Sequence, residues 1–588
     1  MISLLKLFRF LKGSAVTLIV SFVLLSASTG LILVQPRLIE HAIDRGINTG
    51  SLQAIVWGAA GIILAAVLAA GLNLGSGYML IKSSQLMGYT MRNSLYRAIM
   101  SFSFENLDRW RTGELMVRLN SDVNTIRMFV RIGAFLIVQS VIMIIGAVTA
   151  MFLTDPGLAR IMAVFMPLIL IMFFAVATLI RPLFMKTRIA LDELNNTLQE
   201  NLAGAKVVRA FARQDEEFAK FSLRNQNLYA ISLNVGYKLS LFFPLFFLIA
   251  QLATVVVLWS GGTTLIGDLS SGTTGNLTLG KLIAFNNYAT MAMFPLLMLG
   301  MVLNFISMAM ASAVRLGALF AEKPCIEEKP EALSLSSVKG KIEFRDVSFR
   351  YGKGEKALNH INLTVHPGEK LGIIGATGSG KSSLVNLIPR FYDPEEGSVL
   401  VDDVNVRDLS FDTLRTKIAV VLQETVLFSG TLRDNIAFGA TGNGAEELER
   451  AAEIACASEF IDKIPEGWES SVGERGSGLS GGQRQRVAIA RAVAANPDVI
   501  ILDDVTSSLD AKTEKLVIQA LYREFRNRTV IIISQKINTI RYAGRIAVMD
   551  NGRIAAVGTH TELLQSNQIY RTIFETQTGS AADAGRIS

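Results

Sequence analysis

A glycine-rich stretch at residues 375–383 carries the clearest chemical signal in the sequence. It reads GATGSGKSS, which fits the phosphate-binding pattern G-x-x-x-x-G-K-[ST]. Glycine at three positions lets backbone N–H groups approach phosphate closely. Lys381 brings a positive charge to the β- and γ-phosphates, and the hydroxyl of Ser382 is a ligand for Mg²⁺. The predicted phosphate-contacting residues are Gly375, Ala376, Thr377, Gly378, Ser379, Gly380, Lys381, Ser382 and Ser383.

The residues around this stretch place it between a strand and a helix. Residues 370–374 form an apolar run typical of a buried strand, and residues 383–388 begin an amphipathic helical pattern. Strand, glycine loop and helix is the order that this motif needs, so the stretch predicts a site for a nucleoside triphosphate.

Three further polar positions complete the predicted site. Residues 420–424 read as a strand ending near Gln423, whose amide can reach Mg²⁺ or water. Residues 499–502 are apolar and are followed by Asp503, as when a buried parallel strand delivers a carboxylate to its C-terminal edge. Asp503 is thus a predicted Mg²⁺ ligand together with Ser382 and Gln423. Tyr351 follows a predicted strand and can stack on a base, although stacking does not select adenine.

A second anion-binding corner is predicted where a helix begins after Leu479. A serine and two glycines at a helix N-terminus favour negative charge, although an ordinary capped helix explains the same pattern when no phosphate loop is present. The predicted contacts are Ser480, Gly481, Gly482 and Gln483. Two phosphate corners in one domain suggest a nucleotide held between two domains.

The elements that position these residues come after a long apolar region. The chain has 588 residues, of which 50% are hydrophobic, so part of it is expected to lie in a lipid bilayer. The net charge of +7 is scattered along the chain, which argues against a nucleic-acid partner. Cys325 and Cys456 are far apart and indicate neither a disulfide framework nor a zinc site.

Six uncharged windows are long enough to cross about 30 Å of hydrocarbon. They are 13–36, 52–81, 132–154, 161–180, 239–267 and 282–314. Lys and Arg concentrate in the intervals 82–131 and 181–238, whereas the other connections are short and poor in positive charge. The charge distribution therefore predicts a multi-pass membrane protein with both termini and both long intervals in the cytoplasm. Each long interval reads as two helices that extend beyond the bilayer and turn back, near residues 104–107 and 210–213.

The predicted domain order follows from these patterns. We expect a six-helix transmembrane domain at 1–322, a linker at 323–340, an α/β P-loop nucleotide-binding domain at 341–578 and a C-terminal tail at 579–588. The last span is rich in Met and Phe, which adapt to varied apolar ligands. No acidic or basic residue lies within the span windows, so a small amphipathic cargo is favoured over a proton relay or an ion path.

The motifs together resemble the ATP-binding cassette (ABC) superfamily. The resemblance rests on the phosphate loop, Gln423, the LSGGQ sequence at 479–483, Asp503 and the Ser508-Leu509-Asp510 sequence. The six spans resemble an exporter half-transporter, and residues 112–122 resemble its first intracellular loop. The resemblance implies ATP and Mg²⁺ bound between two subunits, with Tyr351 on adenine, Asp510 at the nucleotide and LSGGQ facing the partner's ATP.

Two positions depart from the family pattern. The family's hydrolytic base is a glutamate directly after the strand aspartate, whereas this chain has Asp504, whose side chain is one methylene shorter. The family's switch histidine corresponds to Gln535, which cannot become cationic. Because the remaining motifs are intact, we expect a degenerate ATP site with weak hydrolysis. The sequence resembles the degenerate-site subunit of heterodimeric bacterial multidrug exporters.

The resemblance implies a partner half-transporter that supplies Glu and His and whose own signature sequence can be altered. The implied location is a bacterial inner membrane, and the implied activity is ATP-driven export of apolar or amphipathic, drug-like compounds. A lipid or peptide exporter of the same architecture and a slow homodimeric transporter remain alternatives. A soluble cassette ATPase that acts on nucleic acid and a nucleotide-gated channel are competing functions from other classes.

Overall fold

The computed structural model describes residues 7–270, 277–440, 442 and 444–578. The tail expected at 579–588 lies outside the described residues. The chain divides into two compact units, one formed by residues 1–100 and 112–322 and the other by residues 101–111 and 323–588. The fold class expected from the sequence is confirmed, because a helical membrane region precedes an α/β domain.

The first unit is built from long helices. Six helical stretches in its described part are long and apolar enough to cross a membrane. Its elements are η1 (Phe8–Ser14), α2 (Ala15–Ala42), η2 (Ile43–Ile47), α3 (Leu52–Met100), α5 (Thr112–Val117), η3 (Arg118–Asp122), α6 (Val123–Met128), η4 (Phe129–Gly133), α7 (Ala134–Thr154), α8 (Pro156–Ala203), α9 (Ala205–Ala210), α10 (Gln214–Ser270) and α11 (Leu279–Ala321).

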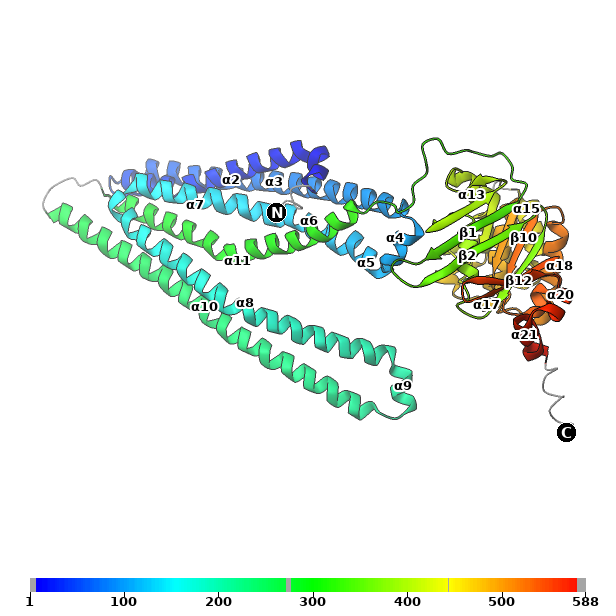
Figure 1. The fold of residues 1–588 in the computed structure, drawn as a ribbon. Coiled ribbons are helices and arrows are strands. Elements are labelled where there is room, and N and C mark those ends of the chain that lie inside the picture. The colour runs from blue at the N-terminus through cyan, green and yellow to red at the C-terminus, as the bar shows by residue number, and fades with distance from the viewer. Residues whose placement is uncertain (1–6, 271–276, 441, 443, 579–588) are drawn as a thin grey trace. The chain divides into compact units, whose positions relative to one another are not determined.

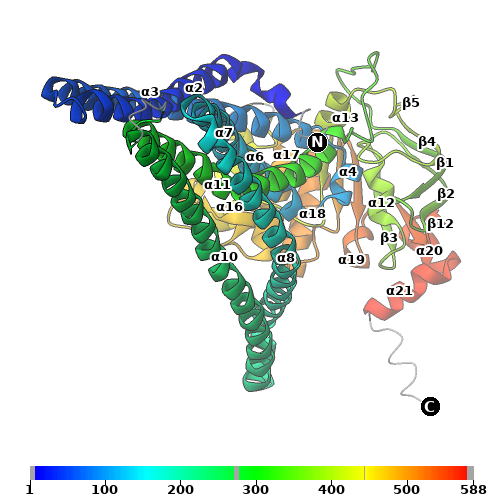
Figure 2. The ribbon, with the colours of Figure 1, turned by 90° about the vertical axis from the view of Figure 1, so that its left-hand side faces the viewer.

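Four of these helices are much longer than a bilayer requires. Helix α3 has 49 residues and α8 has 48, so each is about 70 Å long at roughly 1.5 Å per residue. Helices α8 and α10 run alongside each other and are joined through α9 (Figures 1 and 2). The returning half of the first long interval is less regular than expected, because η3 and η4 are π-helical turns.

Small polar residues hold the membrane helices of this unit together. Ser21 donates a hydrogen bond to the Ser76 carbonyl at 2.9 Å, and Ser28 donates to the Ala69 carbonyl at 2.8 Å. Such residues allow close approach of α2 and α3 where no water competes.

Large apolar side chains of this unit face outward, among them Val16, Leu64, Leu153, Ile171 and Trp259, each more than half exposed. An outward apolar surface on such helices suits contact with lipid.

A buried carboxylate joins two helical segments of the same unit. Asp122 is 1% exposed and accepts a hydrogen bond from Ser312 at 2.8 Å and from the Nε of Arg315 at 2.9 Å. The opposite charge of Arg315 compensates the cost of burying Asp122. This cluster ties η3 to the C-terminal part of α11.

The second unit contains one short helix from the first long interval, α4 (Phe104–Arg109), and the α/β domain. Its strands are β1 (Ile342–Arg350), β2 (Lys356–Val365), β3 (Lys370–Gly375), β4 (Glu396–Val401), β5 (Val404–Asn405), β6 (Ile418–Val421), β7 (Gly430–Thr431), β8 (Ser471–Val472), β9 (Val499–Asp503), β10 (Thr529–Ile533), β11 (Arg545–Asp550) and β12 (Arg553–Gly558). Its other helices are α12 (Lys381–Asn386), α13 (Phe411–Lys417), α14 (Leu432–Ala437), α15 (Ala445–Ile454), α16 (Ser458–Ile461), η5 (Gly467–Glu469), η6 (Glu474–Gly476), α17 (Gly481–Ala494), α18 (Ala511–Glu524), α19 (Ile537–Ile540), α20 (His560–Ser566) and α21 (Gln568–Thr578).

The main sheet has six strands in the order β12-β11-β3-β10-β9-β6. Strands β6, β9, β10, β3 and β11 are parallel, and β12 is antiparallel. A second, antiparallel sheet has the order β2-β1-β4-β5. Strands β9 and β10 are completely buried, which fits the four consecutive apolar residues in each, before Asp503 in β9 and after Thr529 in β10.

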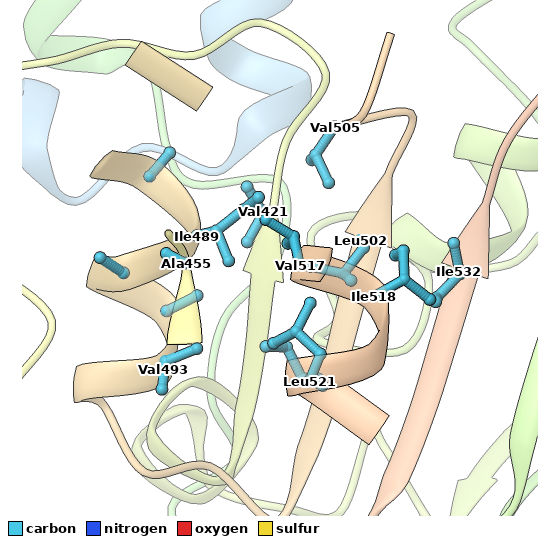
Figure 3. Close-up of a cluster of buried hydrophobic side chains, with 14 of the residues drawn as sticks. Val421, Ala455, Ile489, Val493, Leu502, Val505, Val517, Ile518, Leu521 and Ile532 are labelled. Carbon is cyan, nitrogen blue, oxygen red and sulfur yellow. The ribbon is translucent and has the colours of Figure 1, made fainter. Parts of the chain in front are cut away.

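Helices α17 and α18 pack on the main sheet through aliphatic side chains. Figure 3 shows this cluster, which includes Val421, Ile489, Val493, Leu502, Val517, Ile518, Leu521 and Ile532. Each buried aliphatic side chain contributes about 1.5–3 kcal/mol of transfer free energy. This packing therefore fixes the position of the strands relative to α17 and α18. The carboxyl ends of these strands carry the candidate site.

Candidate nucleotide-binding site

The carboxyl ends of four parallel strands meet at one edge of the sheet. The phosphate loop follows β3, Asp504 follows β9, and Gln535 comes two residues after β10. Gln423 lies two residues beyond β6, so the strand ends earlier than the sequence pattern predicted. A cavity of 330 Å³ at this edge is lined by Tyr351, Ala357, Thr377, Gly378, Gly380, Lys381, Ser382, Ser383, Gln423, Asp503, Asp504, Ile533 and Gln535.

The glycines of the phosphate loop are required by its geometry. A Cβ on Gly375 would lie 2.3 Å from the Met549 carbonyl oxygen, and one on Gly380 would lie 2.6 Å from the Ala357 carbonyl oxygen. Gly378 has a φ of +82°, and its surroundings are open. Gly378 is thus required for its backbone conformation and not for packing, and its open side leaves room for a phosphate.

Lys381 is held against the loop that precedes it. Its Nζ donates to the carbonyl oxygens of Gly375 at 2.9 Å and Ala376 at 2.7 Å. Burial lowers the pKa of Lys381, whereas the nearby Asp504 and Asp503 raise it. The ammonium group is therefore close to the loop backbone, where a phosphate would offer stronger acceptors than carbonyl oxygens.

Ser382 and Asp503 form a pair that suits Mg²⁺. The Ser382 hydroxyl donates to Oδ1 of Asp503 at 3.0 Å. Burial raises the pKa of Asp503, and the hydrogen bond from Ser382 lowers it. Among the described residues no group of three or more His, Cys, Asp or Glu side chains could hold a metal. A magnesium ion would therefore take its remaining ligands from phosphate and water, as Mg²⁺ commonly does.

Asp504 and Gln535, the two positions that depart from the family pattern, line this same cavity. Asp504 has a φ of 48°, and its N–H donates to the Ile533 carbonyl at 3.0 Å, so the chain turns sharply after β9. Burial raises the pKa of Asp504, whereas the charge of Lys381 and a hydrogen bond from the Gln535 backbone lower it. Both residues thus line the cavity that Lys381 also lines, and Asp504 is close enough for the charge of Lys381 to act on it.

Tyr351 also lines the cavity. Its ring makes edge-to-face contacts with Phe349, at a centroid distance of 4.7 Å, and with Tyr392, at 5.1 Å. The residue is 41% exposed. Neighbouring rings fix its orientation and leave part of it free, which suits stacking on a base.

The remaining sequence-predicted residues are not among those that line this cavity. Ser379 is buried in the loop, and Gly375 and Ala376 line a neighbouring cavity of 510 Å³. Ser480 caps α17 and forms a reciprocal capping box with Gln483. Asp510 caps α18 by accepting from the Thr513 N–H at 2.9 Å.

The LSGGQ sequence at 479–483, called the signature sequence below, lies against the Ser508-Leu509-Asp510 sequence. Together they form the second predicted anion-binding corner. Gln485 accepts from the Ser508 N–H at 3.2 Å, and a Cβ on Gly482 would lie 3.0 Å from the Ser508 carbonyl oxygen. One chain therefore presents two separate groups of nucleotide-site residues. Both groups are predicted from the sequence to contact nucleotide. In the structure the residues of each group lie together, and the signature residues are not among those that line the cavity.

Sequence reasoning missed two residues that touch the candidate site. Tyr392 packs on Tyr351, and Gln577 makes a hydrogen bond to the Gln535 backbone. Tyr392 lies in an aromatic pair with Phe391 shortly after the loop, which is a weak signal for a site residue. Gln577 has no local signal, because its contact crosses 42 residues.

Comparison with known proteins decides the family. Residues 18–296 match the model described as the ABC transporter transmembrane region, and residues 358–507 match the model described as ABC transporter. The chain is 34% identical over 550 residues to YknU of Bacillus subtilis, described as an uncharacterized ABC transporter ATP-binding protein, with 93% of each chain covered. This chain belongs to the ABC transporter family.

Two further comparisons identify an ABC exporter. The chain is 38% identical over 484 residues to the ATP-dependent lipid A-core flippase of Desulfotalea psychrophila, covering 82% of each chain. A solved bacterial Atm1-family ABC exporter with ATP bound matches with a TM-score of 0.78 at 26% identity, covering 96% of this chain and 98% of that one. The ABC exporter described here is thus a multi-pass membrane protein whose ATPase domain implies ATP binding and hydrolysis coupled to transport.

Proposed function

We propose that this ABC exporter is one subunit of a heterodimer and that its own phosphate loop binds Mg²⁺–ATP but hydrolyses it slowly. The observation that carries the proposal is the position of Asp504 and Gln535 in the cavity beside Lys381. These two residues replace the general base and the switch cation, whereas the residues that bind phosphate and Mg²⁺ are intact.

The chemistry of these two residues explains slow hydrolysis. A carboxylate that is one methylene shorter sits about 1 Å or more from the position that glutamate reaches, and such a displacement costs on the order of a hundredfold in rate. The carboxamide of Gln535 can donate a hydrogen bond but cannot carry the positive charge that a protonated histidine offers. When bound, Mg²⁺ supplies charge neutralisation at the phosphates, so binding does not depend on these two residues.

The second corner supports a paired arrangement. Ser480 and Gly482 are gathered with Ser508 and are not among the residues that line this chain's own cavity. Presented to a partner's nucleotide, this corner would complete a site in which the partner supplies Glu and His. The pair would then contain one weak and one competent site.

The membrane region supports an amphipathic cargo. Several large, adaptable side chains of α11 are exposed, including Phe294 at 63%, Met301 at 51% and Met308 at 49%. The name of the lipid A-core flippase relative favours a lipid, and a drug-like amphiphile has the same physical character. We place both termini in the cytoplasm, because the positive charge gathers in the long intervals. We place the spans in a bacterial inner membrane, because the family resemblance implies it.

The test uses the full-length chain purified alone in lipid nanodiscs. The wild-type chain is expected to hydrolyse ATP slowly, and the Asp504→Glu/Gln535→His variant at least about tenfold faster, because it restores the base and the switch cation. Lys381→Ala serves as the control for contaminating ATPase. A wild-type chain that is as fast as the double variant would instead indicate a homodimer with two competent sites.

The partner and the cargo need separate measurements. Affinity purification of the tagged chain from its native membrane is expected to recover a second half-transporter with Glu and His at the corresponding positions. Stimulation of the pair's ATPase by phospholipid and glycolipid, compared with amphipathic cations, then separates a lipid exporter from a drug exporter. Recovery of the tagged chain with itself alone would contradict the heterodimer.

A further inference from the structure

The C-terminal helix α21 contacts the loop that carries Gln535. The Nε2 of Gln577 donates to the Gln535 carbonyl at 2.6 Å, and its Oε1 accepts from the Ile537 N–H at 2.9 Å. One carboxamide therefore bridges a backbone carbonyl in the segment between β10 and α19 and the first backbone N–H of α19. Both contacts lie within the second unit of the chain.

This bridge needs a group that both donates and accepts. Among side chains of this length, glutamine has an amide donor and a carbonyl acceptor fixed side by side, whereas glutamate lacks the donor and lysine lacks the acceptor. The segment between β10 and α19 is an irregular turn with few ladder hydrogen bonds of its own. Gln577 satisfies one backbone carbonyl of this turn and the first N–H of α19, and so restricts the position of the turn.

Helix α21 is itself firmly attached to the domain. Tyr570 is completely buried, and its hydroxyl lies 2.7 Å from Nδ1 of His560. Ile573 and Phe574 pack against the core cluster that contains α17 and α18. The Nε of Arg571 also donates to the Leu564 carbonyl at 2.8 Å. Gln577 is thus held by a helix that shares the core of the ATPase domain.

The bridged segment leads directly to the position of the hydrolytic base. The Gln535 backbone makes a hydrogen bond that favours the ionised carboxyl of Asp504 and so lowers its pKa. The Asp504 N–H in turn donates to the Ile533 carbonyl at 3.0 Å. The bond from the Asp504 N–H to Ile533 therefore connects Asp504 to the chain two residues before Gln535, whose carbonyl Gln577 holds.

We propose that Gln577 is a positioning residue of the nucleotide site, which holds the Gln535 segment where its side chain and the residue at position 504 can act on the same phosphate. Its role is indirect, because it contacts the backbone of the segment and is not among the residues that line the 330 Å³ cavity. The loop displacement that follows its loss would lower the rate of hydrolysis without weakening nucleotide binding at the phosphate loop. The hydrolysis test of this inference rests on the proposed function, and the exchange test does not.

The first experiment measures amide hydrogen exchange on the full-length protein in nanodiscs. In Gln577→Ala, exchange in a peptide spanning residues 533–541 is expected to rise about fivefold, because one protecting hydrogen bond is removed. Thr576→Ala is the matched control, since the Thr576 hydroxyl bonds the Thr572 carbonyl within α21. Exchange unchanged by Gln577→Ala, or raised equally by Thr576→Ala, would overturn the inference.

The second experiment measures ATP hydrolysis in the Asp504→Glu/Gln535→His background. Adding Gln577→Ala or Gln577→Glu is expected to lower kcat about fivefold or more at unchanged KM for ATP, since both remove the donor to residue 535. A merely structural role predicts instead a lower Tm and a raised KM. If the background variant is not faster than wild type, the proposed function fails; if it is faster but Gln577→Ala leaves both kcat and exchange unchanged, the positioning role fails.

Discussion

At the scale of single residues, Asp503 and Asp504 show how two adjacent carboxylates acquire different tasks. Asp503 ends the buried strand β9 and accepts from Ser382. Asp504 lies past the turn, near Lys381 and the Gln535 backbone. Burial raises the pKa of both. Each charge is therefore costly in the free protein, and a bound cation would compensate it.

Replacement of Asp503 by Asn tests this cost. Because folding raises the pKa of Asp503, its ionised form destabilises the folded state above the raised pKa, and the cost vanishes below the ordinary pKa of about 3.9. In EDTA at pH 8, the full-length Asp503→Asn variant should therefore melt at the same or a higher temperature than wild type, and any gain should vanish as the pH falls toward about 4. Mg²⁺–ATP should stabilise only the wild type.

The outcome that would contradict this account is a lower Tm of Asp503→Asn at pH 8 without ligand. That result would mean that the ionised carboxylate stabilises the ligand-free fold. Its charge would then need no metal ion to compensate it. Scanning fluorimetry with and without Mg²⁺–ATP on the same preparations makes both comparisons.

Gly378 provides a second test at this scale. Its φ of +82° is strained for any other residue, at a cost of about 1–2 kcal/mol, so Gly378→Ala should weaken ATP binding roughly tenfold. Gly467 also has a positive φ, of +52°, and lies outside the cavity, so Gly467→Ala is a matched control for strain alone. Fluorescent nucleotide titration measures both, and equal losses would refute a specific role for Gly378.

At the scale of elements, the short helix α4 is attached to the ATPase domain close to the base-stacking position. Phe104 stacks on Phe391 at a centroid distance of 4.2 Å, and the Tyr392 hydroxyl donates to Oδ2 of Asp108 at 2.7 Å. Tyr392 also packs on Tyr351. Tyr392 therefore contacts both α4, which comes from the first long interval, and Tyr351, which is predicted to stack on adenine.

Tyr392→Phe keeps the ring and removes the hydrogen bond to Asp108. We expect unchanged basal affinity for ATP but about a tenfold or greater loss of cargo-stimulated ATPase, which corresponds to one hydrogen bond to a charged group. Burial raises the pKa of Tyr392, so its hydroxyl stays a donor and the effect should not change between about pH 6 and 9.

Asp108→Asn is the control for this experiment, because its carbonyl oxygen can still accept from Tyr392. It should retain more stimulation than Tyr392→Phe. A similar loss in both variants would contradict this expectation and show that a neutral acceptor cannot replace the carboxylate of Asp108 in this hydrogen bond.

At the scale of the whole molecule, the two groups of nucleotide-site residues determine what one subunit can do. The phosphate loop and the signature corner occupy different places on one ATPase domain, and the signature residues are not among those that line the described cavity. In a homodimer both composite sites would carry Asp504 and Gln535. In a heterodimer the same chain would contribute a weak site and half of a competent one.

The purified pair allows these possibilities to be separated. Replacing the partner's catalytic Glu by Gln should abolish turnover, whereas Asp504→Asn in this chain should change it by less than about twofold, since hydrolysis there contributes little. Steady-state ATPase and nucleotide retention after rapid desalting report both effects. Equal loss of turnover from the two substitutions would show that both sites hydrolyse ATP.

The sequence by itself determined the features that depend on short spacing or on segment length. The glycines around Lys381, the apolar run before Asp503 and the six apolar spans are local patterns, because phosphate binding, strand burial and bilayer crossing each act within one element. Asp504 and Gln535 stand out only through the resemblance to the ABC family, as departures at two positions that follow buried strands.

Only the tertiary structure decided which distant residues support the site. The bridge from Gln577 to the Gln535 segment and the hydrogen bond from Tyr392 to Asp108 join residues 42 and 284 positions apart. Hydrogen bonds of this kind depend on where helices pack and leave no periodicity in the sequence. The sheet order that brings β3, β9, β10 and β6 to one edge arises in the same way, since strand neighbours are chosen by packing and not by chain order.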